Sequence, residues 1–314
     1  MKAVVQRRYG SAVPGDLDVP VPGNGEVLLE VRAAGVDMGV WHLLTGKPYL
    51  VRFLGFGFRG PKSPVPGRDV SGVVKEIGPG VSEFAVGDEV FGTCEGSFAE
   101  YAVAPVSRLA RKPEGVSFTE TAALPISGGT ALQGLRGVQP GQRVLVLGAG
   151  GGVGSYGVQI AKALGAHVTA VCSTRKVELA RTLGADEVFD YTVADFTGTY
   201  DLILDCGGAR PLSRLRRATN EGGRIVLVGA ETGGSITGGF HKSIGALFLN
   251  PFSSRKFVPL MSQERGEIFD ELRVMVEAGT VKPAVGKVFP LSEALDAVDH
   301  VYSRRSVGKT VVAI

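Results

Sequence analysis

The chain has 314 residues, of which 44% are hydrophobic and 21% are charged. These proportions are ordinary for a globular protein and exclude a disordered chain, and the length predicts two domains or one large one. Lys and Arg number 34 against 31 Asp and Glu, which gives a net charge of +3. So small a surplus does not indicate a nucleic acid or a membrane surface as a partner.

The three cysteines, Cys94, Cys172 and Cys206, lie far apart and form no Cys-x-x-Cys motif. This spacing argues against a disulfide framework and against a structural zinc site. The first residues turn polar too soon for a secretion signal, and no apolar run approaches the roughly 18 residues of a membrane span. We therefore expect a cytoplasmic protein without a metal.

The first third of the chain has short apolar segments separated by turns rich in Gly and Pro. The segments are residues 1–5, 25–31, 70–77 and 86–92. Strands this short and this closely spaced predict a small β-barrel. Residues 52–64 differ, because they place Phe53, Phe56 and Phe58 among Gly, Arg and Pro. We interpret them as a long apolar loop that either folds over its own core or covers a substrate.

From about residue 113 onwards, the patterns of strands and helices alternate. Strands are expected at residues 143–148, 167–172, 201–206, 224–229 and 309–314. Helices are expected at residues 152–164, 175–183, 211–219 and 268–278. Alternating units of this size predict an α/β fold with a doubly wound parallel sheet and helices on both faces.

A glycine-rich turn joins the first of these strands to the first helix. Its core reads Ala-x-Gly-x-x-Gly at Ala149, Gly151 and Gly154, so Ala replaces the first glycine of the dinucleotide-binding fingerprint. The glycines would let the backbone approach a pyrophosphate, and the start of the helix would supply partial positive charge. The required context of strand, turn, helix and second strand is present. The alternative is a purely structural turn.

The end of the second strand indicates which dinucleotide binds. NAD-binding sites usually place Asp or Glu there, whereas this chain has Ser173, Thr174, Arg175 and Lys176 after Cys172. Hydroxyls and cations suit a 2′-phosphate, so we predict NADPH. The alternative for Arg175 and Lys176 is a solvated helix start, although cations there oppose the helix dipole.

Three parts of the chain resemble a known family: residues 66–74 with 86–92, residues 124–131, and residues 141–162. Through them the chain resembles the medium-chain dehydrogenase/reductase superfamily, within it the zinc-free quinone oxidoreductase (ζ-crystallin-like) branch. The resemblance implies a GroES-like β-barrel catalytic domain at residues 1–123 and 260–314. It also implies a Rossmann NADPH-binding domain at residues 124–259.

The resemblance further assigns site residues position by position. It implies contacts with the pyrophosphate, the 2′-phosphate and the nicotinamide from Thr130, Gly151, Gly152, Val153, Ser173, Lys176, Tyr191, Gly229, Ala230, Phe248 and Leu249. Tyr49 matches a tyrosine near the cofactor and substrate, and a tyrosine of this region is the proposed proton donor in related enoyl reductases. Trp41 either walls the substrate pocket or packs in the core, and Phe53, Phe56 and Phe58 would make the pocket mouth apolar.

Two departures from the family pattern affect the expected chemistry. Zinc-dependent relatives carry Gly-His-Glu where this chain has Gly67-Arg68-Asp69, and the other zinc ligands are replaced as well, so the usual zinc sites cannot form. Asp37 stands where many zinc-free relatives have Asn. An Asp donates a hydrogen bond only when it is protonated, so the contact expected there changes.

Quinones and alkenes conjugated to a carbonyl accept a hydride without a metal. We therefore predict NADPH-dependent reduction of a small apolar quinone or α,β-unsaturated carbonyl, with Tyr49 and Asp37 as the catalytic candidates. One alternative is an NADPH-binding sensor or structural protein without turnover, and another is a zinc-free alcohol dehydrogenase. The resemblance also implies a homodimer, for which residues 246–249 are a candidate edge strand.

Overall fold

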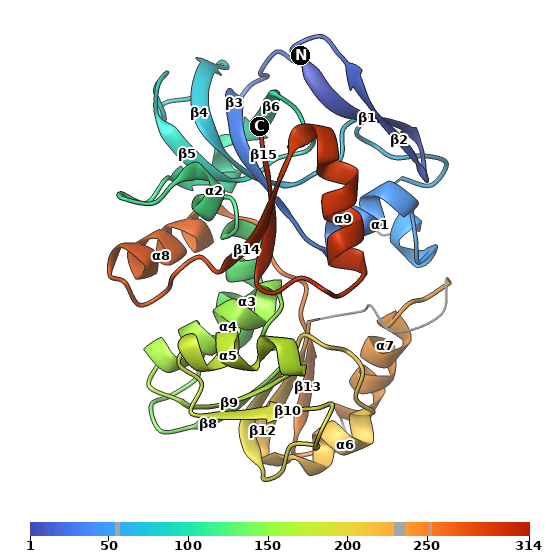
Figure 1. Cartoon of the computed structure of the whole chain (residues 1–314), viewed down its shortest axis with the longest axis vertical. Coiled ribbons are helices and arrows are strands. Elements are labelled where there is room, and N and C mark those ends of the chain that lie inside the picture. Colours follow the sequence, from blue (N-terminus) through green and yellow to red (C-terminus); the bar gives the residue numbers. More distant parts are fainter. Residues whose placement is uncertain (54–56, 229–235, 251–252) are drawn as a thin grey trace. The chain divides into compact units, whose positions relative to one another are not determined.

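The computed structural model describes residues 1–53, 57–228, 236–250 and 253–314. The chain divides into two compact units, which we call the barrel unit and the Rossmann unit. The barrel unit comprises Met1–Gly129, Gln263–Gly279 and Pro283–Ile314, and the Rossmann unit comprises Thr130–Ser262 and Thr280–Lys282. In Figure 1 the barrel unit therefore contains both the blue start and the red end of the chain.

A seven-stranded sheet forms the centre of the barrel unit, in the order β14-β15-β3-β4-β5-β7 with β6 paired to β3. β14 and β15 are parallel to each other, and the other neighbours are antiparallel. The bounds are β3 Glu26–Val36, β4 Asp69–Ile77, β5 Glu89–Thr93, β6 Tyr101–Pro105, β7 Leu109–Arg111, β14 Val285–Pro290 and β15 Lys309–Ala313. The first hairpin, β1 (Lys2–Arg8) and β2 (Ser11–Asp16), forms a sheet of its own.

Short helices complete the barrel unit: α1 Met38–Thr45, α2 Phe118–Thr121, α8 Gly266–Glu277 and α9 Ala294–Tyr302. α1 begins where the Asp37 side chain accepts a hydrogen bond from the Val40 amide, and it ends at Gly46, which has a left-handed φ of 59°. α1 and α9 contribute Val40 and Val298 to one buried apolar cluster. α3 (Pro125–Leu135) begins in the barrel unit and continues into the Rossmann unit.

The Rossmann unit contains a six-stranded, fully parallel sheet in the order β10-β9-β8-β11-β12-β13. Its strands are β8 Arg143–Leu147, β9 His167–Cys172, β10 Glu187–Asp190, β11 Tyr200–Asp205, β12 Thr219–Leu227 and β13 Lys256–Pro259. Its helices are α4 Gly152–Ala163, α5 Val177–Thr182, α6 Leu212–Arg217 and α7 Phe240–Leu249. The strand order reverses beside β8, and ligands bind at the carboxyl ends of strands at such a point.

The two faces of this sheet are covered by different helices, as Figure 1 shows. Alternate residues of a strand point to opposite faces. Leu145 and Ile203 belong to an apolar cluster with residues of α6 and α7. Leu204, the neighbour of Ile203, lies instead against the glycines of α3 and α4, at Gly134 and Gly157. This two-sided burial confirms the predicted doubly wound α/β fold.

One expected element is wrong. Residues 246–249 are the end of helix α7, and the edge strand of the sheet is β13. The apolar run there suited a strand and a helix equally, and the sequence pattern alone could not separate them.

In the part of the chain that the structure describes, no helix is both long and apolar enough to span a membrane.

Candidate active site

The turn between β8 and α4 is built from glycines that the geometry requires. Gly148 has a φ of +82°, a conformation that favours glycine. A Cβ atom on Gly154 would lie only 2.2 Å from the carbonyl oxygen of Gly148. Helix α4 therefore approaches the end of β8 more closely than any side chain would permit. The third glycine of the fingerprint serves this packing, as the motif predicts.

The first turn of α4 can hold an anion. Gly151 is the N-cap, so Gly152 and Val153 follow it with N–H groups that have no acceptor within the helix. A Cβ added to Gly151 would meet only the Gly148 oxygen, at 3.4 Å, so the turn is open on its outer side. The helix dipole favours negative charge here. The residues predicted to bind a pyrophosphate therefore fit one.

The carboxyl ends of β9 and β10 bring three further predicted residues to the same edge of the sheet. Asp190 pairs with Cys172, and the Tyr191 amide donates to the Cys172 carbonyl at 3.0 Å. Tyr191 therefore follows β10 just where Ser173 follows β9. Lys176 lies close by, because a Cβ on Gly150 would be 2.5 Å from the Lys176 Cβ. Burial lowers the pKa of Lys176 because it disfavours the charged ammonium, and a bound anion would favour that charged form again.

The remaining predicted cofactor residues are not gathered in this way. Thr130 is buried on α3. Phe248 and Leu249 end α7, where the Phe248 side chain is 73% exposed. Gly229 and Ala230 lie outside the described residues. Their roles at the nicotinamide stay predictions.

A buried cluster of charges lies beside Asp37 in the barrel unit. The Lys309 ammonium is 2.7 Å from Asp69 Oδ2, 3.1 Å from Ser127 Oγ and 3.7 Å from Asp37 Oδ2. Asp69 also accepts a hydrogen bond from the Ile126 amide at 2.8 Å. Strand pairing creates the cluster, because Lys309 begins β15, Asp37 follows β3 and Asp69 begins β4.

The cluster holds one ammonium for two carboxylates. Burial disfavours the charged form of Lys309, but the carboxylates of Asp69 and Asp37 outweigh that effect and raise its pKa. Burial raises the pKa of Asp69 to about 6, against the attraction of Lys309. Asp37 Oδ1 caps α1, whereas its buried Oδ2 has no hydrogen-bond partner among the described residues. This oxygen faces the Lys309 ammonium, 3.7 Å away.

Tyr49 is held by a stack of aromatic and cationic groups. The Arg52 guanidinium carbon lies 4.9 Å from the Tyr49 ring centroid and 4.5 Å from that of Tyr9. Arg52 Nε also donates to the Gly46 carbonyl at 2.9 Å. A Cβ on Gly46 would strike both Arg52 and Tyr9 at 2.8 Å, so this stack needs glycine there. The Tyr49 side chain, 43% exposed, is thus oriented yet accessible.

The predicted substrate-pocket residues occupy two different places. Phe53 and Phe58 are exposed and contact each other, with ring centroids 5.1 Å apart, while Phe56 lies outside the described residues. Trp41 stacks on Tyr302 at 4.5 Å, where α1 packs against α9. Packing is thus the contact observed for Trp41, and its place in a substrate pocket stays a prediction.

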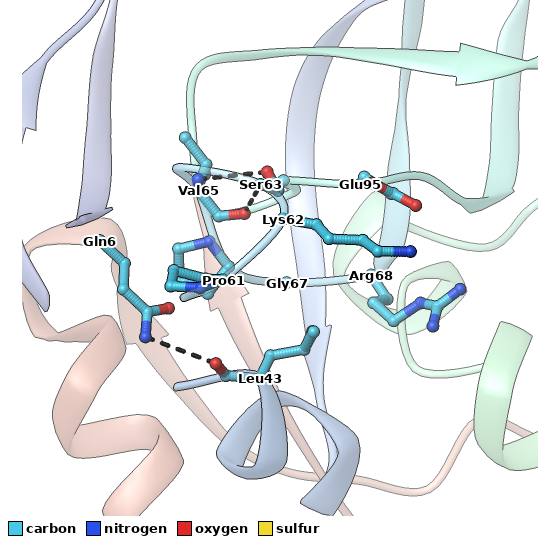
Figure 2. Close-up of a pocket in the computed structure, with 11 residues that line it drawn as sticks. Gln6, Leu43, Pro61, Lys62, Ser63, Val65, Gly67, Arg68 and Glu95 are labelled. Atoms are coloured by element: carbon cyan, nitrogen blue, oxygen red, sulfur yellow. Dashed lines mark hydrogen bonds between the residues drawn. The ribbon is translucent and has the colours of Figure 1, made fainter. Parts of the chain in front are cut away.

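The barrel unit also contains a cavity of about 130 Å³, between the β1 strand, the end of α1 and residues 61–68 (Figure 2). Arg68, Lys62 and Glu95 gather on one side of it, and Gln6 lies on the other. Gln6 Nε2 donates to the Leu44 carbonyl at 2.6 Å, which ties β1 to α1 beside the cavity.

Comparisons with known proteins support this architecture. Two family models match: the alcohol dehydrogenase GroES-like domain over residues 23–114 and zinc-binding dehydrogenase over residues 183–312. The chloroplast envelope quinone oxidoreductase homolog of Arabidopsis thaliana is 32% identical, over 99% of this chain and 98% of that relative. The chain belongs to the medium-chain dehydrogenase/reductase superfamily.

Within this superfamily the chain falls in the quinone oxidoreductase branch. The NADPH-dependent alkenal/one oxidoreductase of A. thaliana chloroplasts is 32% identical, over 99% of this chain and 79% of that relative. The solved quinone oxidoreductase of Coxiella burnetii aligns with a TM-score of 0.86 at 27% identity, covering 100% of this chain and 99% of that one. The resemblance stated from the sequence is confirmed.

One matching family model is named for zinc, but the residues of this chain do not fit that ion. Arg68 brings a guanidinium to the Gly67-Arg68-Asp69 segment, and a guanidinium donates hydrogen bonds but coordinates no cation. Across the described ranges, no three His, Cys, Asp or Glu side chains gather as metal ligands. The donor set does not fit zinc, and no step below passes through a metal.

Three residues near the candidate site were not predicted from the sequence. Lys309 could not be foreseen as the partner of Asp37, because only strand pairing brings them together. Arg52 was predicted only to begin a loop, although an arginine three residues after Tyr49 can reach the Tyr49 ring. Arg68 was compared with a zinc ligand but given no role, and the structure places it in a cavity wall.

Proposed function

We propose that this protein is an NADPH-dependent, zinc-independent reductase of quinones or α,β-unsaturated carbonyls. The observation that carries the proposal is its likeness, along nearly the whole chain, to relatives named for quinones and for NADPH-dependent alkenal/one reduction. Both acceptor classes are electron-poor through conjugation, so hydride transfer to them needs orientation and charge stabilisation rather than a Lewis acid. The donor set that does not fit zinc supports this chemistry.

The cofactor assignment rests on the edge formed by β8, β9 and β10. The start of α4 would hold the pyrophosphate through Gly151, Gly152 and Val153. Ser173, Lys176 and Tyr191 would hold the 2′-phosphate, since they supply hydroxyls and a cation, and the residues that follow β9 in sequence include no Asp or Glu before Glu178. When bound, NADPH supplies the hydride.

In this proposal the chain's own residues position the acceptor and deliver a proton. Tyr49, or a water molecule that it orders, donates the proton to the acceptor's carbon or oxygen. Arg52 stacks on the Tyr49 ring and acts as its positioning residue. Asp37 is the second participant, because its buried Oδ2 lies free of hydrogen bonds among the described residues.

The first test is turnover by the purified wild-type protein with EDTA present. We expect NADPH oxidation with quinones, enones and enals, but none with simple ketones. NADPH should be preferred over NADH because the end of β9 offers cations to a 2′-phosphate. A preference for NADH would contradict the 2′-phosphate assignment, and loss of turnover with the chelator would contradict zinc independence. NADPH binding without any turnover would favour a sensor or structural role.

The role of Tyr49 is tested by the variant Tyr49→Phe, which keeps the ring and removes only the hydroxyl. We expect kcat to fall by about 10²-fold, the lower end for a general acid. Tyr302→Phe is the matched control, because Tyr302 is a half-exposed tyrosine of the same unit that stacks on Trp41 instead. Equal, undiminished kcat values for both variants would remove Tyr49 from the mechanism.

We also propose a homodimer in the cytoplasm. The edge of β13 and the exposed apolar side chains of α7 would form the contact between copies. The small number and wide spacing of the cysteines, Cys94, Cys172 and Cys206, support a reducing compartment.

A further inference from the structure

The guanidinium of Arg68 is fixed at the wall of the barrel-unit cavity. Its Nη2 donates to Glu264 Oε2 at 2.7 Å, and the two side chains are 26% and 20% exposed. A guanidinium carries five N–H donors in a rigid plane. Among the described residues, Glu264 is the hydrogen-bond partner of Arg68, and the buried Nε has none. The ion pair therefore orients the group, and no hydrogen bond of its Nη1 to a described residue occupies that nitrogen.

The cavity has the size and the wall of a small-molecule site. Its volume of about 130 Å³ compares with the roughly 150 Å³ of an engineered cavity that binds benzene. Apolar walls come from Leu43, Val65, Pro61 and Pro66. The charged side chains Lys62, Arg68 and Glu95 lie on one side, and Gln6 lies on the other (Figure 2). A six-membered ring with one oxygen turned toward Arg68 matches this division.

The charges around the cavity favour an oxygen that becomes negative. Lys62 lies on the same side as Arg68, and the described residues include no ion pair of Lys62. Glu95 and Glu264 oppose these two cations, so the wall is close to neutral before an acceptor binds. An acceptor oxygen that becomes negative could accept hydrogen bonds from Arg68 and Lys62 in a partly buried site, where such pairing is stronger than in water.

We propose that Arg68 is a catalytic residue that binds the acceptor's carbonyl oxygen and stabilises the negative charge formed there. The proposal rests on the function proposed above. An enone accepts the hydride at its β-carbon, the carbon–carbon π pair moves toward the carbonyl, and the oxygen becomes an enolate. A proton added to the α-carbon completes the saturated carbonyl, so one hydride and one proton are consumed. A quinone reduced at oxygen or carbon likewise passes through a phenolate-like oxygen.

The kinetic test compares Arg68→Met and Arg68→Lys with the control Arg32→Met. Arg32 is a suitable control because it also forms an ion pair in the barrel unit, with Glu30 at 3.1 Å, and its own side chain is exposed. We expect kcat with an enone to fall about 10²-fold in Arg68→Met, as when one oxyanion donor is removed. Arg68→Lys keeps the charge but not the planar fork, so its loss should be smaller. An Arg68→Met enzyme as active as Arg32→Met would overturn the proposal.

A second test separates the oxygen-binding role from folding. In Arg68→Ala, added guanidinium ion at low concentration should restore part of kcat, whereas sodium chloride at equal ionic strength should not. Rescue by both salts, or by neither, in a folded variant would contradict a direct contact. If Arg68→Met does not fold, the Lys variant and this rescue still decide the question.

A binding measurement keeps this proposal distinct from the proposed function. 4-Nitrophenolate mimics a ring with an anionic oxygen, and nitrobenzene is its neutral counterpart. By calorimetry, wild-type protein should bind the phenolate at least about tenfold more tightly than Arg68→Met does, the value of a charged hydrogen bond. Nitrobenzene should bind both alike. This result would uphold the Arg68 site even if no acceptor were turned over, and equal phenolate binding would refute it.

Discussion

At the scale of single residues, the ammonium of Lys309 determines the behaviour of two buried carboxylates. Its side chain is 1% exposed and lies 2.7 Å from Asp69, which is also fully buried. Removing one partner of such a pair leaves an uncompensated charge in a medium that solvates it poorly. Asp37, the predicted catalytic residue, depends on the same ammonium at 3.7 Å. The cluster therefore connects the stability of the barrel unit to the chemistry proposed for Asp37.

The variant Lys309→Met should lower the free energy of unfolding by about 3–5 kcal/mol at neutral pH. The deficit should shrink as the pH falls from 8 toward 6, by at most about 1.4 kcal/mol per unit, and level off below about pH 6, where wild-type Asp69 takes up a proton as well. Asp69 already has a raised folded-state pKa, near 6. Without Lys309, the folded variant holds a proton on Asp69 that the unfolded chain releases, so acid favours folding. Urea unfolding across this pH range measures the effect.

Two further variants show whether the unpaired charge of Asp69 causes the instability of Lys309→Met. Lys309→Met combined with Asp69→Asn removes both charges, so its stability should depend less on pH than that of the single variant. Lys75→Met disrupts an exposed ion pair with Glu30 and should cost less than about 1 kcal/mol. A Lys309→Met deficit no larger than that of Lys75→Met would show that the buried pair contributes little.

At the scale of elements, local pattern predicted the structure where one segment carries its own signals. β9 has the predicted bounds, and β8 and α4 differ from them by one residue, because an apolar strand, a glycine turn and an amphipathic helix follow each other directly. The segment 246–249 was wrong because an apolar run of four residues fits both periodicities. α1 was missed, although its start at Asp37 and its end at Gly46 are ordinary capping signals.

At the scale of the whole molecule, the Rossmann-side site could be predicted and the barrel-side site only in part. Ser173, Lys176 and the glycine turn are close in sequence, so one motif identifies them. The cluster of Asp37, Asp69 and Lys309 joins three strands, with Lys309 240 residues after Asp69 in the chain, and no local pattern encodes that pairing. Arg68 was visible only as a departure from a family motif, and its cavity appears only when β1, α1 and residues 61–68 meet.

The remaining surface of the Rossmann unit predicts assembly. Ile244 and Leu247 are 52% and 55% exposed on α7, and β13 ends the sheet beside this helix. An edge strand with an apolar neighbour is a surface that a second copy can cover. Light scattering coupled to size exclusion should therefore give the mass of a dimer, and Leu247→Glu should convert it to a monomer.

Val193→Glu supplies the control for that experiment. Val193 is 82% exposed in the same unit, outside α7 and β13, so a charge there should leave the dimer intact. Leu247→Glu should affect assembly alone, because Leu247 belongs to none of the proposed cofactor contacts. The affinity of this variant for NADPH should stay within about twofold of the wild-type value, the range of ordinary surface changes. A monomeric wild-type protein would show that this surface forms no dimer. A dimer that survives Leu247→Glu would show that the contact lies elsewhere, because a buried glutamate without a partner is not tolerated in an apolar interface.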